Sequence, residues 1–159
     1  VVDKLLGDGI MAFWGFPDHP DDHARQAVQA ALAVQLGMDR VNEALAARGV
    51  APFQVRVGLA TGQVTVGEIG GDVLADFTVI GRHVNLAARL QASAPPGGIL
   101  LSQPTWNQAG DAVGSWVERQ EPLTVRGFDE PLVTYLVWAR RPVIGLAPYR
   151  RLEGQSPLA

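Results

Sequence analysis

The sequence has 159 residues, of which 47% are hydrophobic and 18% charged, so it encodes a globular domain rather than a disordered segment. Its net charge of -3, with basic residues scattered along the chain, argues against a nucleic-acid partner, which would require clustered Lys and Arg. Because there is no cysteine and the three histidines are dispersed, disulfides and thiolate sites are excluded, and a His-rich zinc site is disfavoured.

The first predicted element is a hairpin, "KLLGDGIMAF", in which Gly7-Asp8-Gly9 forms the reversal between two apolar strands. Such Asp-Gly turns are common, and a simple turn is one sufficient interpretation. The same geometry presents the Asp8 carboxylate with open space around it. An acid placed in this way suits a cation, or a polyanion that is held through a cation.

Hydrophobic periodicity and turn residues predict the remaining elements. In chain order they are a helix over 21–48, a hairpin over 53–70 that turns at Gly62, a strand over 76–81, a helix over 82–94, a strand over 98–102, a short helix or turn over 103–110 and a closing hairpin over 123–139 around Gly127. Tight turns join several neighbouring strands, so we expect a mixed, mostly antiparallel sheet with helices packed on it. The predicted fold class is therefore α+β rather than a doubly wound parallel sheet.

Asn85 and Arg89 lie four residues apart on the helix predicted over 82–94, so they share one face of it. An amide and a guanidinium that project together can orient a ribose and neutralise a phosphate, because Arg presents a planar fork to phosphate oxygens. Charged residues mostly lie exposed, so a solvated helix face is the other interpretation. The spacing alone does not decide between the two.

Four motifs together resemble the catalytic domain of class III nucleotidyl cyclases, which are adenylate and guanylate cyclases. They are "DKLLGDGIMAFWG", "VRVGLATGQVTVGEIG", "DFTVIGRHVNLAARLQ" and "LTVRGFDEPLVTYLV", in the family's order and at about its separations. On this resemblance we expect a bacterial-type catalytic domain over 1–140 and a linker or C-terminal extension over 141–159. It implies a ferredoxin-like βαββαβ core that dimerises head to tail, with ATP bound in clefts between two copies.

The resemblance also implies a role for each matching residue. Family members use two divalent ions, Mg²⁺ or Mn²⁺, carried by two aspartates, and Asp8 matches the second. The other matches are Lys4 for the adenine edge, Thr78 (often Asp in the family) for the purine amino group, Asn85 for the ribose, Arg89 for the α-phosphate and Arg126 for the terminal phosphates. Lys4 with Thr78 favours ATP over GTP, because guanylate cyclases usually carry Glu in place of the lysine. In each cleft one copy would supply the metals, and the other Lys4, Thr78, Asn85 and Arg89.

The sequence departs from the family pattern in two places. The family's first metal aspartate lies on a strand, followed by a helix, before the Gly-Asp turn, and this sequence starts after that point. Asp3 is not expected to replace it, because it lies on the strand of Lys4, only five residues before Asp8. We therefore expect the chain as given to lack its N-terminal strand and helix and to have little or no cyclase activity. Arg82 is the second departure, since the family usually has an acid there, at the positive end of a helix.

The leading hypothesis is an adenylate cyclase catalytic domain that converts ATP to 3′,5′-cyclic AMP and pyrophosphate at a homodimer interface. A non-catalytic cyclase-homology module that binds nucleotide or mediates dimerisation is the alternative, favoured by the missing aspartate and Arg82. An unrelated ferredoxin-like binding domain would require all four motifs to match by accident. We also expect an upstream sensor or membrane domain. Since no apolar run reaches the roughly 20 residues of a membrane span, the expected location is cytoplasmic, including as the cytosolic domain of a membrane-bound protein.

Overall fold

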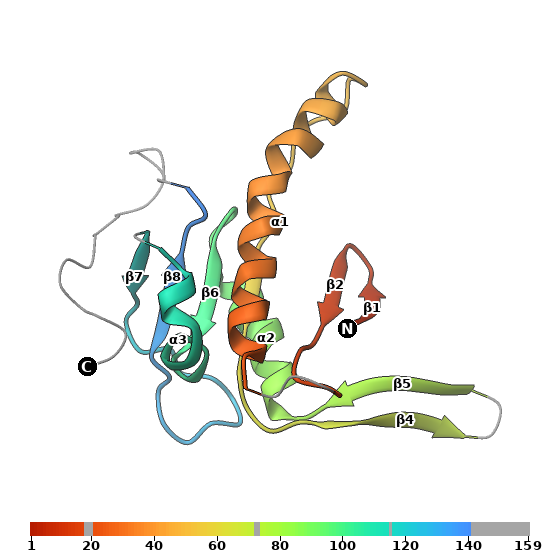
Figure 1. Ribbon diagram of the computed structural model, residues 1–159, viewed down its shortest axis with the longest axis vertical. Helices are drawn as coiled ribbons and strands as arrows, with labels where there is room; N and C mark the ends of the chain where they lie inside the picture. Colours follow the sequence, from red (N-terminus) through yellow and green to blue (C-terminus); the bar gives the residue numbers. More distant parts are fainter. Residues whose placement is uncertain (18–20, 72–73, 115, 141–159) are drawn as a thin grey trace.

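The computed structural model describes residues 1–17, 21–71, 74–114 and 116–140, so the expected linker over 141–159 lies outside the described residues. The elements, in chain order, are β1 (Val2–Leu6), β2 (Gly9–Ala12), α1 (His23–Ala46), β3 (Val57–Leu59), β4 (Thr65–Gly71), β5 (Leu74–Ile80), α2 (Arg82–Ser93), β6 (Ile99–Ser102), α3 (Gln103–Ala109), a 3-10 turn (Gly110–Ala112), β7 (Val117–Arg119) and β8 (Thr134–Val137) (Figure 1). Within these ranges, no helix is long and apolar enough to cross a membrane.

The strands form three sheets. A four-stranded sheet has the order β3-β6-β8-β7, and β1-β2 and β4-β5 are separate two-stranded hairpins. Among the strands that the structure describes, only the β3–β6 pair is parallel, and the other pairs are antiparallel. The α+β class with a mixed, mostly antiparallel sheet is therefore confirmed.

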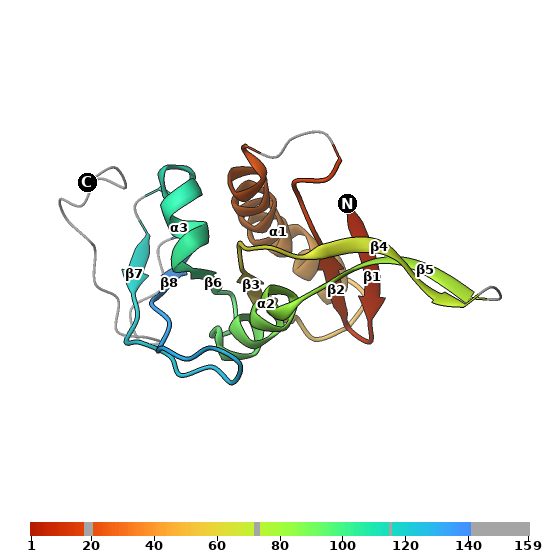
Figure 2. The same cartoon turned by 90° about the horizontal axis from the view of Figure 1, so that it is seen from below.

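The four-stranded sheet is the middle layer of the molecule, because β6 buries side chains on both faces. Ile99 and Leu101 pack with α1, α3 and the strands beside them. Leu100, between them in sequence, packs with Leu86 and Leu90 of α2 on the opposite face. Successive side chains of β6 thus belong to clusters on opposite faces of the sheet, and the cluster around Leu100 holds α2 against the sheet. Figure 2 shows α2 beside the sheet.

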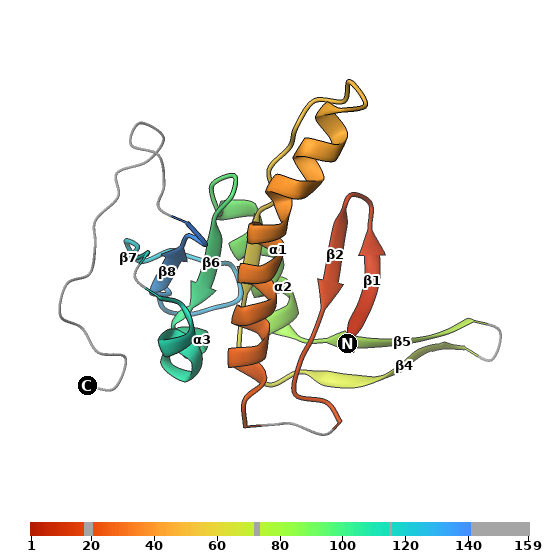
Figure 3. The same ribbon diagram turned by 45° about the horizontal axis from the view of Figure 1, so that its top comes forward.

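The hairpin predicted around Asp8 is confirmed. Leu6 pairs with Gly9, which leaves Gly7 and Asp8 as a two-residue loop. Gly7 has φ +63, and a positive φ at this position is what a primed hairpin turn requires. The hairpin stands against the β4-β5 ribbon, where β1 contacts β5 (Figure 3).

The helix predicted over 21–48 is observed as α1, but its apolar stripe is buried only in the first half. Ala24, Val28 and Ala31 lie in the core, whereas Val34 and Val41 are exposed. The helix ends at Ala46, shortly before the expected stop at Gly49. Gly49 has a φ of +72, which lets the chain reverse while the Val50 N–H donates to the Leu45 carbonyl.

The hairpin predicted over 53–70 is wrong. β3 pairs in parallel with β6, and β4 pairs with β5, so the two strands of that segment belong to different sheets. Gly62 is not a hairpin turn but a close-packing position, because a side chain there would overlap the His83 ring. The hairpin predicted over 123–139 is present only in part, as a single bridge between Leu123 and Leu132. The last strand, β8, pairs instead with β6 and β7. β7 was not predicted from the sequence.

Candidate active site

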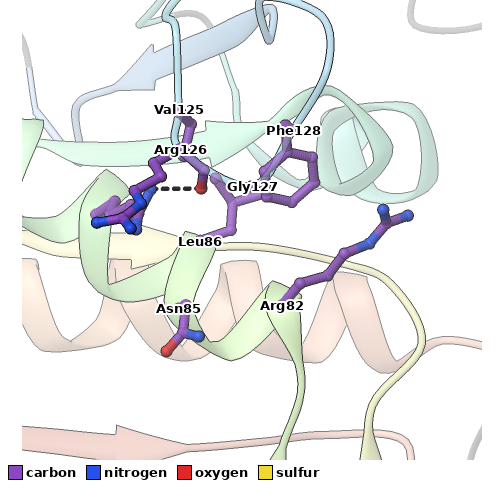
Figure 4. Close-up of a pocket in the computed structure, with 8 residues that line it drawn as sticks. Arg82, Asn85, Leu86, Val125, Arg126, Gly127 and Phe128 are labelled. Carbon is purple, nitrogen blue, oxygen red and sulfur yellow. Dashed lines mark hydrogen bonds between the residues drawn. The ribbon is translucent and has the colours of Figure 1, made fainter.

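A pocket of about 290 Å³ lies between α2 and the loop that precedes β8. Its lining consists of Arg82, Asn85, Leu86, Arg89, Val125, Arg126, Gly127 and Phe128 (Figure 4). Three of the expected site residues, Asn85, Arg89 and Arg126, are therefore brought together. The lining holds three guanidinium groups and no acid, so the pocket is chemically suited to an anionic ligand.

Burial of the opposite helix face determines which side chains of α2 reach this pocket. Leu86 and Leu90 are 3% and 0% exposed and anchor α2 on the sheet. Asn85 and Arg89 lie on the outer side of the same helix, where both line the pocket. From the facing loop, Val125 is buried while Arg126 is exposed. Both sides of the pocket thus rest on core residues.

A hydrogen bond joins the two sides of the pocket. Arg89 Nη1 donates to the carbonyl oxygen of Arg126 at 2.6 Å, which holds the Arg89 guanidinium near the Arg126 loop. The dashed line in Figure 4 marks this bond. A guanidinium has five N–H donors, so one bond to a neutral carbonyl leaves donors for a phosphate. The contact preorganises Arg89 without neutralising its charge.

Arg82, the departure from the family pattern, begins α2 and extends away from Arg126 (Figure 4). Its guanidinium carbon lies 5.2 Å from the centre of the Phe128 ring, within the range of a cation–π contact. α2 has no acidic residue in its first turn, and Gly81 provides no side-chain cap. The Arg82 charge is therefore held by the Phe128 ring rather than by a carboxylate of this helix.

Lys4 and Thr78 lie on β1 and β5, two strands that contact each other. Thr78 is 7% exposed, and its Oγ1 donates to Asp3 Oδ2 at 2.7 Å. Lys4, the next residue after Asp3, is partly buried. The fold thus brings the strand of Lys4 to Thr78, across more than 70 positions of sequence. In the sequence, Asp3 was of interest only as a substitute metal ligand, and no sequence pattern indicates its pairing with Thr78.

Asp8 lies outside the pocket. Its carboxylate is exposed at the loop between β1 and β2, and the pocket lining does not include it. An exposed carboxylate fits a hard divalent cation that completes its shell with water and phosphate oxygens. Among the described residues, however, no group of three or more His, Asp or Glu side chains is gathered to hold a metal. Asp8 therefore fits as one ligand of the expected two-ion site, not as the whole site.

Comparison with protein families matches residues 3–139 to the adenylate and guanylate cyclase catalytic domain, and the chain belongs to this family. Its fold is similar to the adenylyl cyclase CyaB from P. aeruginosa, with a TM-score of 0.81 and 34% identity over 88% of this chain and 72% of that chain. The guanylyl cyclase Cya2 is also similar, with a TM-score of 0.77 and 32% identity over 86% of this chain and 68% of that chain. The resemblance found in the four motifs is confirmed.

Relatives in sequence include longer proteins. Adenylate cyclase 1 of Rhizobium meliloti is 36% identical over 88 residues, which is 55% of this chain and 13% of that protein. An uncharacterised protein of Mycobacterium tuberculosis is 31% identical over 133 residues, which is 82% of this chain. The chain spans only 22% of the length of that mycobacterial relative.

Proposed function

We propose that this chain is the catalytic module of an adenylate cyclase, which forms 3′,5′-cyclic AMP and pyrophosphate from ATP in a cleft shared by two copies. The observation that carries the proposal is the acid-free pocket in which Asn85, Arg89 and Arg126 meet. Its volume of about 290 Å³ is at the low end for ligand pockets, which supports a half-site that a second copy completes. The position of Asp8 outside the lining supports the same division.

ATP is proposed as the substrate because of Lys4 and Thr78. An ammonium donates to adenine N1, which is an acceptor, whereas guanine carries a proton on the equivalent nitrogen. The Thr78 hydroxyl can accept from the adenine N6 amino group. Relatives of both specificities match this chain, so the choice of base rests on these two side chains and on what holds them.

The reaction is an in-line displacement at the α-phosphorus. The ribose 3′-oxygen forms a bond to that phosphorus and releases its proton to water. The bond from the α-phosphorus to the oxygen that bridges it to the β-phosphorus breaks, and pyrophosphate leaves with that oxygen. Asn85 orients the ribose so that the 3′-oxygen lies in line with the leaving group. Arg89 stabilises the negative charge that develops on the α-phosphate oxygens, and Arg126 binds the terminal phosphates that depart.

Divalent cations belong to this proposal as Mg²⁺ or Mn²⁺, with Asp8 as the ligand that the chain supplies. When bound, such ions lower the pKa of the attacking hydroxyl and neutralise the triphosphate. The resemblance calls for two aspartates, and Asp8 matches one of them. We therefore expect the 159-residue chain to bind ATP while forming little or no cyclic AMP.

The test is formation of cyclic nucleotide from ATP and from GTP with Mn²⁺. The chain is compared with a version extended at its N-terminus by a strand and helix that carry the family's first metal aspartate. Activity on ATP in the extended version, abolished by Asp8→Ala, is the expected result. Asp39→Ala is the matched control, because Asp39 is an exposed carboxylate that pairs with Arg140 and should leave activity unchanged.

The alternative is a cyclase-homology module that binds nucleotide or dimerises without turnover. Arg82, a base where the family usually has an acid, favours it. Inactivity of a folded, dimeric extended version would select this alternative, and Arg82→Asp would then be the first reversion to examine.

The wider organisation of the protein is also proposed. The family match over 3–139 supports a cyclase domain over 1–140, with 141–159 as a linker or extension. Because the mycobacterial relative is much longer than this chain, we expect an upstream sensor or membrane domain to control a cytoplasmic cyclase, with no nucleic-acid partner.

A further inference from the structure

Asp3 is the extra residue of a bulge in the β1–β2 hairpin. Val2 pairs with Ala12 and Lys4 pairs with Met11, so Asp3 has no partner across the hairpin. A bulge breaks the alternation of a strand and re-aims a side chain. Asp3 and Lys4 are accordingly both partly buried, between exposed neighbours, although consecutive residues of a regular strand face opposite sides.

The re-aimed carboxylate determines where the Thr78 hydroxyl proton lies. Thr78 Oγ1 is 2.7 Å from Asp3 Oδ2, and an ionised carboxylate can only accept. The hydroxyl has one proton and two lone pairs, so once its proton is directed to Asp3, it offers only lone pairs to any other group. Thr78 is 7% exposed, so little water competes for that proton.

The second oxygen of the Asp3 carboxylate accepts no hydrogen bond from the described residues. Asp3 Oδ1 is buried and has no hydrogen-bond partner within the described part of the chain. Native proteins satisfy most buried polar atoms, so such an exception calls for an explanation. A carboxylate kept for what it does to Thr78, rather than for the stability of the hairpin, supplies one.

Adenine and guanine differ at the atom that Thr78 would face. Adenine has an amino group at position 6, which donates, whereas guanine has an oxygen there, which accepts. A hydroxyl that only accepts pairs with the first and opposes the second. We infer that Asp3 is a specificity-determining positioning residue, which makes Thr78 an obligate acceptor and thereby sets the preference for adenine; this inference rests on the proposed function.

With an amide in place of the Asp3 carboxylate, the amide N–H can donate to the Thr78 oxygen, and the Thr78 hydroxyl can then rotate and donate to the guanine oxygen. The pair therefore does with two residues what a carboxylate at position 78 would do directly. This equivalence predicts a rescue: moving the acid from position 3 to position 78 should restore the preference that its removal abolishes.

The test measures the affinities of ATP and GTP for the 159-residue chain by competition against a fluorescent ATP analogue. Asp3→Asn should reduce the preference for ATP about tenfold, mainly by improving GTP binding. The reason is that the Thr78 hydroxyl can then donate a hydrogen bond to the guanine oxygen. Thr78→Val should reduce it similarly, and Asp3→Asn added to Thr78→Val should change nothing more. The double variant Asp3→Asn with Thr78→Asp should regain the preference, and Asp39→Asn is the acid-to-amide control.

The outcomes separate the two proposals. If the unmutated chain prefers ATP and a folded Asp3→Asn variant keeps that preference within about twofold, the inference is overturned and the proposed function stands. If Asp3→Asn does not fold, Thr78→Val decides, because a retained preference for ATP without the hydroxyl equally overturns the inference. If the unmutated chain binds neither nucleotide, or prefers GTP, the proposed function is overturned, and so is this inference, which rests on it.

Discussion

Gly58→Ala is expected to force β3 away from α2, the helix that carries Asn85 and Arg89. Gly58 is the middle residue of β3, and a Cβ atom added there would overlap the Ala87 carbonyl oxygen and the Gln91 nitrogen. It would also lie 2.9 Å from Gln91 Cα, inside the roughly 3.5–4.0 Å of a normal carbon contact. All three atoms are helix backbone, so no side-chain rotation relieves the overlap.

The loss of folding stability expected for Gly58→Ala lies at the upper end of the range for overpacked cores. An extra methyl group in a packed core typically lowers the free energy of unfolding by about 1–3 kcal/mol. Because the neighbours of Gly58 are helix backbone atoms that cannot rotate away, we expect a loss of about 3 kcal/mol. For a domain of this size, that corresponds to a fall in Tm of about 6–12 °C. Since the displaced helix forms one side of the pocket, ATP binding should weaken together with the fall in Tm.

Thermal unfolding followed by circular dichroism measures the first effect, and nucleotide competition measures the second. Gly67→Ala is the matched control, because Gly67 also lies in a strand but an added Cβ would meet no heavy atom within 4 Å. Its Tm should be unchanged or slightly raised. Equal Tm values for Gly58→Ala and Gly67→Ala would refute the close approach of β3 to α2.

Three further substitutions test the two faces of the sheet and the charge at position 82. Leu90→Ala removes a fully buried side chain between α2 and β6 and should lower the free energy of unfolding by about 2–5 kcal/mol in urea titrations. Ser102→Ala removes the hydroxyl that caps α3 and contacts Thr105 Oγ1 at 2.9 Å, at a cost of about 1–2 kcal/mol in the same assay. Arg82→Asp should change stability by less than about 1 kcal/mol, because the gain at the positive end of α2 offsets the lost contact with Phe128. A Tm that falls by more than about 5 °C in the last variant would contradict this balance.

Local patterns predicted most of the elements. The Gly-Asp turn, the helix over 82–94 and the strand over 98–102 are all observed, because each depends on residues that are close in sequence. Strand partners were not predictable in the same way. Alternation marked the strands of 53–70 correctly but could not indicate that β3 pairs in parallel with β6, some 40 positions later. β7 is three residues long and has no alternation to detect.

In the candidate site, too, features that depend on neighbouring residues were predictable, and features that depend on tertiary contacts were not. The spacing of Asn85 and Arg89 was sufficient to place them on one helix face, and burial of Leu86 and Leu90 explains why that face is available. The bond from Arg89 to the Arg126 carbonyl depends on how a loop closes over the helix, which no local pattern encodes. The Asp3–Thr78 pair depends on a bulge and on a contact between two hairpins, so it emerges only from the folded chain.

The most direct test of a cleft shared by two copies is complementation between two inactive variants. Asp8→Ala and Arg89→Ala, each made in the version extended to carry the first metal aspartate, are assayed alone and mixed for cyclic AMP formation from ATP. Random pairing places one intact cleft in half of the dimers, so the mixture should recover about a quarter of the unmutated activity while each variant alone stays inactive. A mixture that stays inactive although both variants fold and exchange subunits would contradict the account.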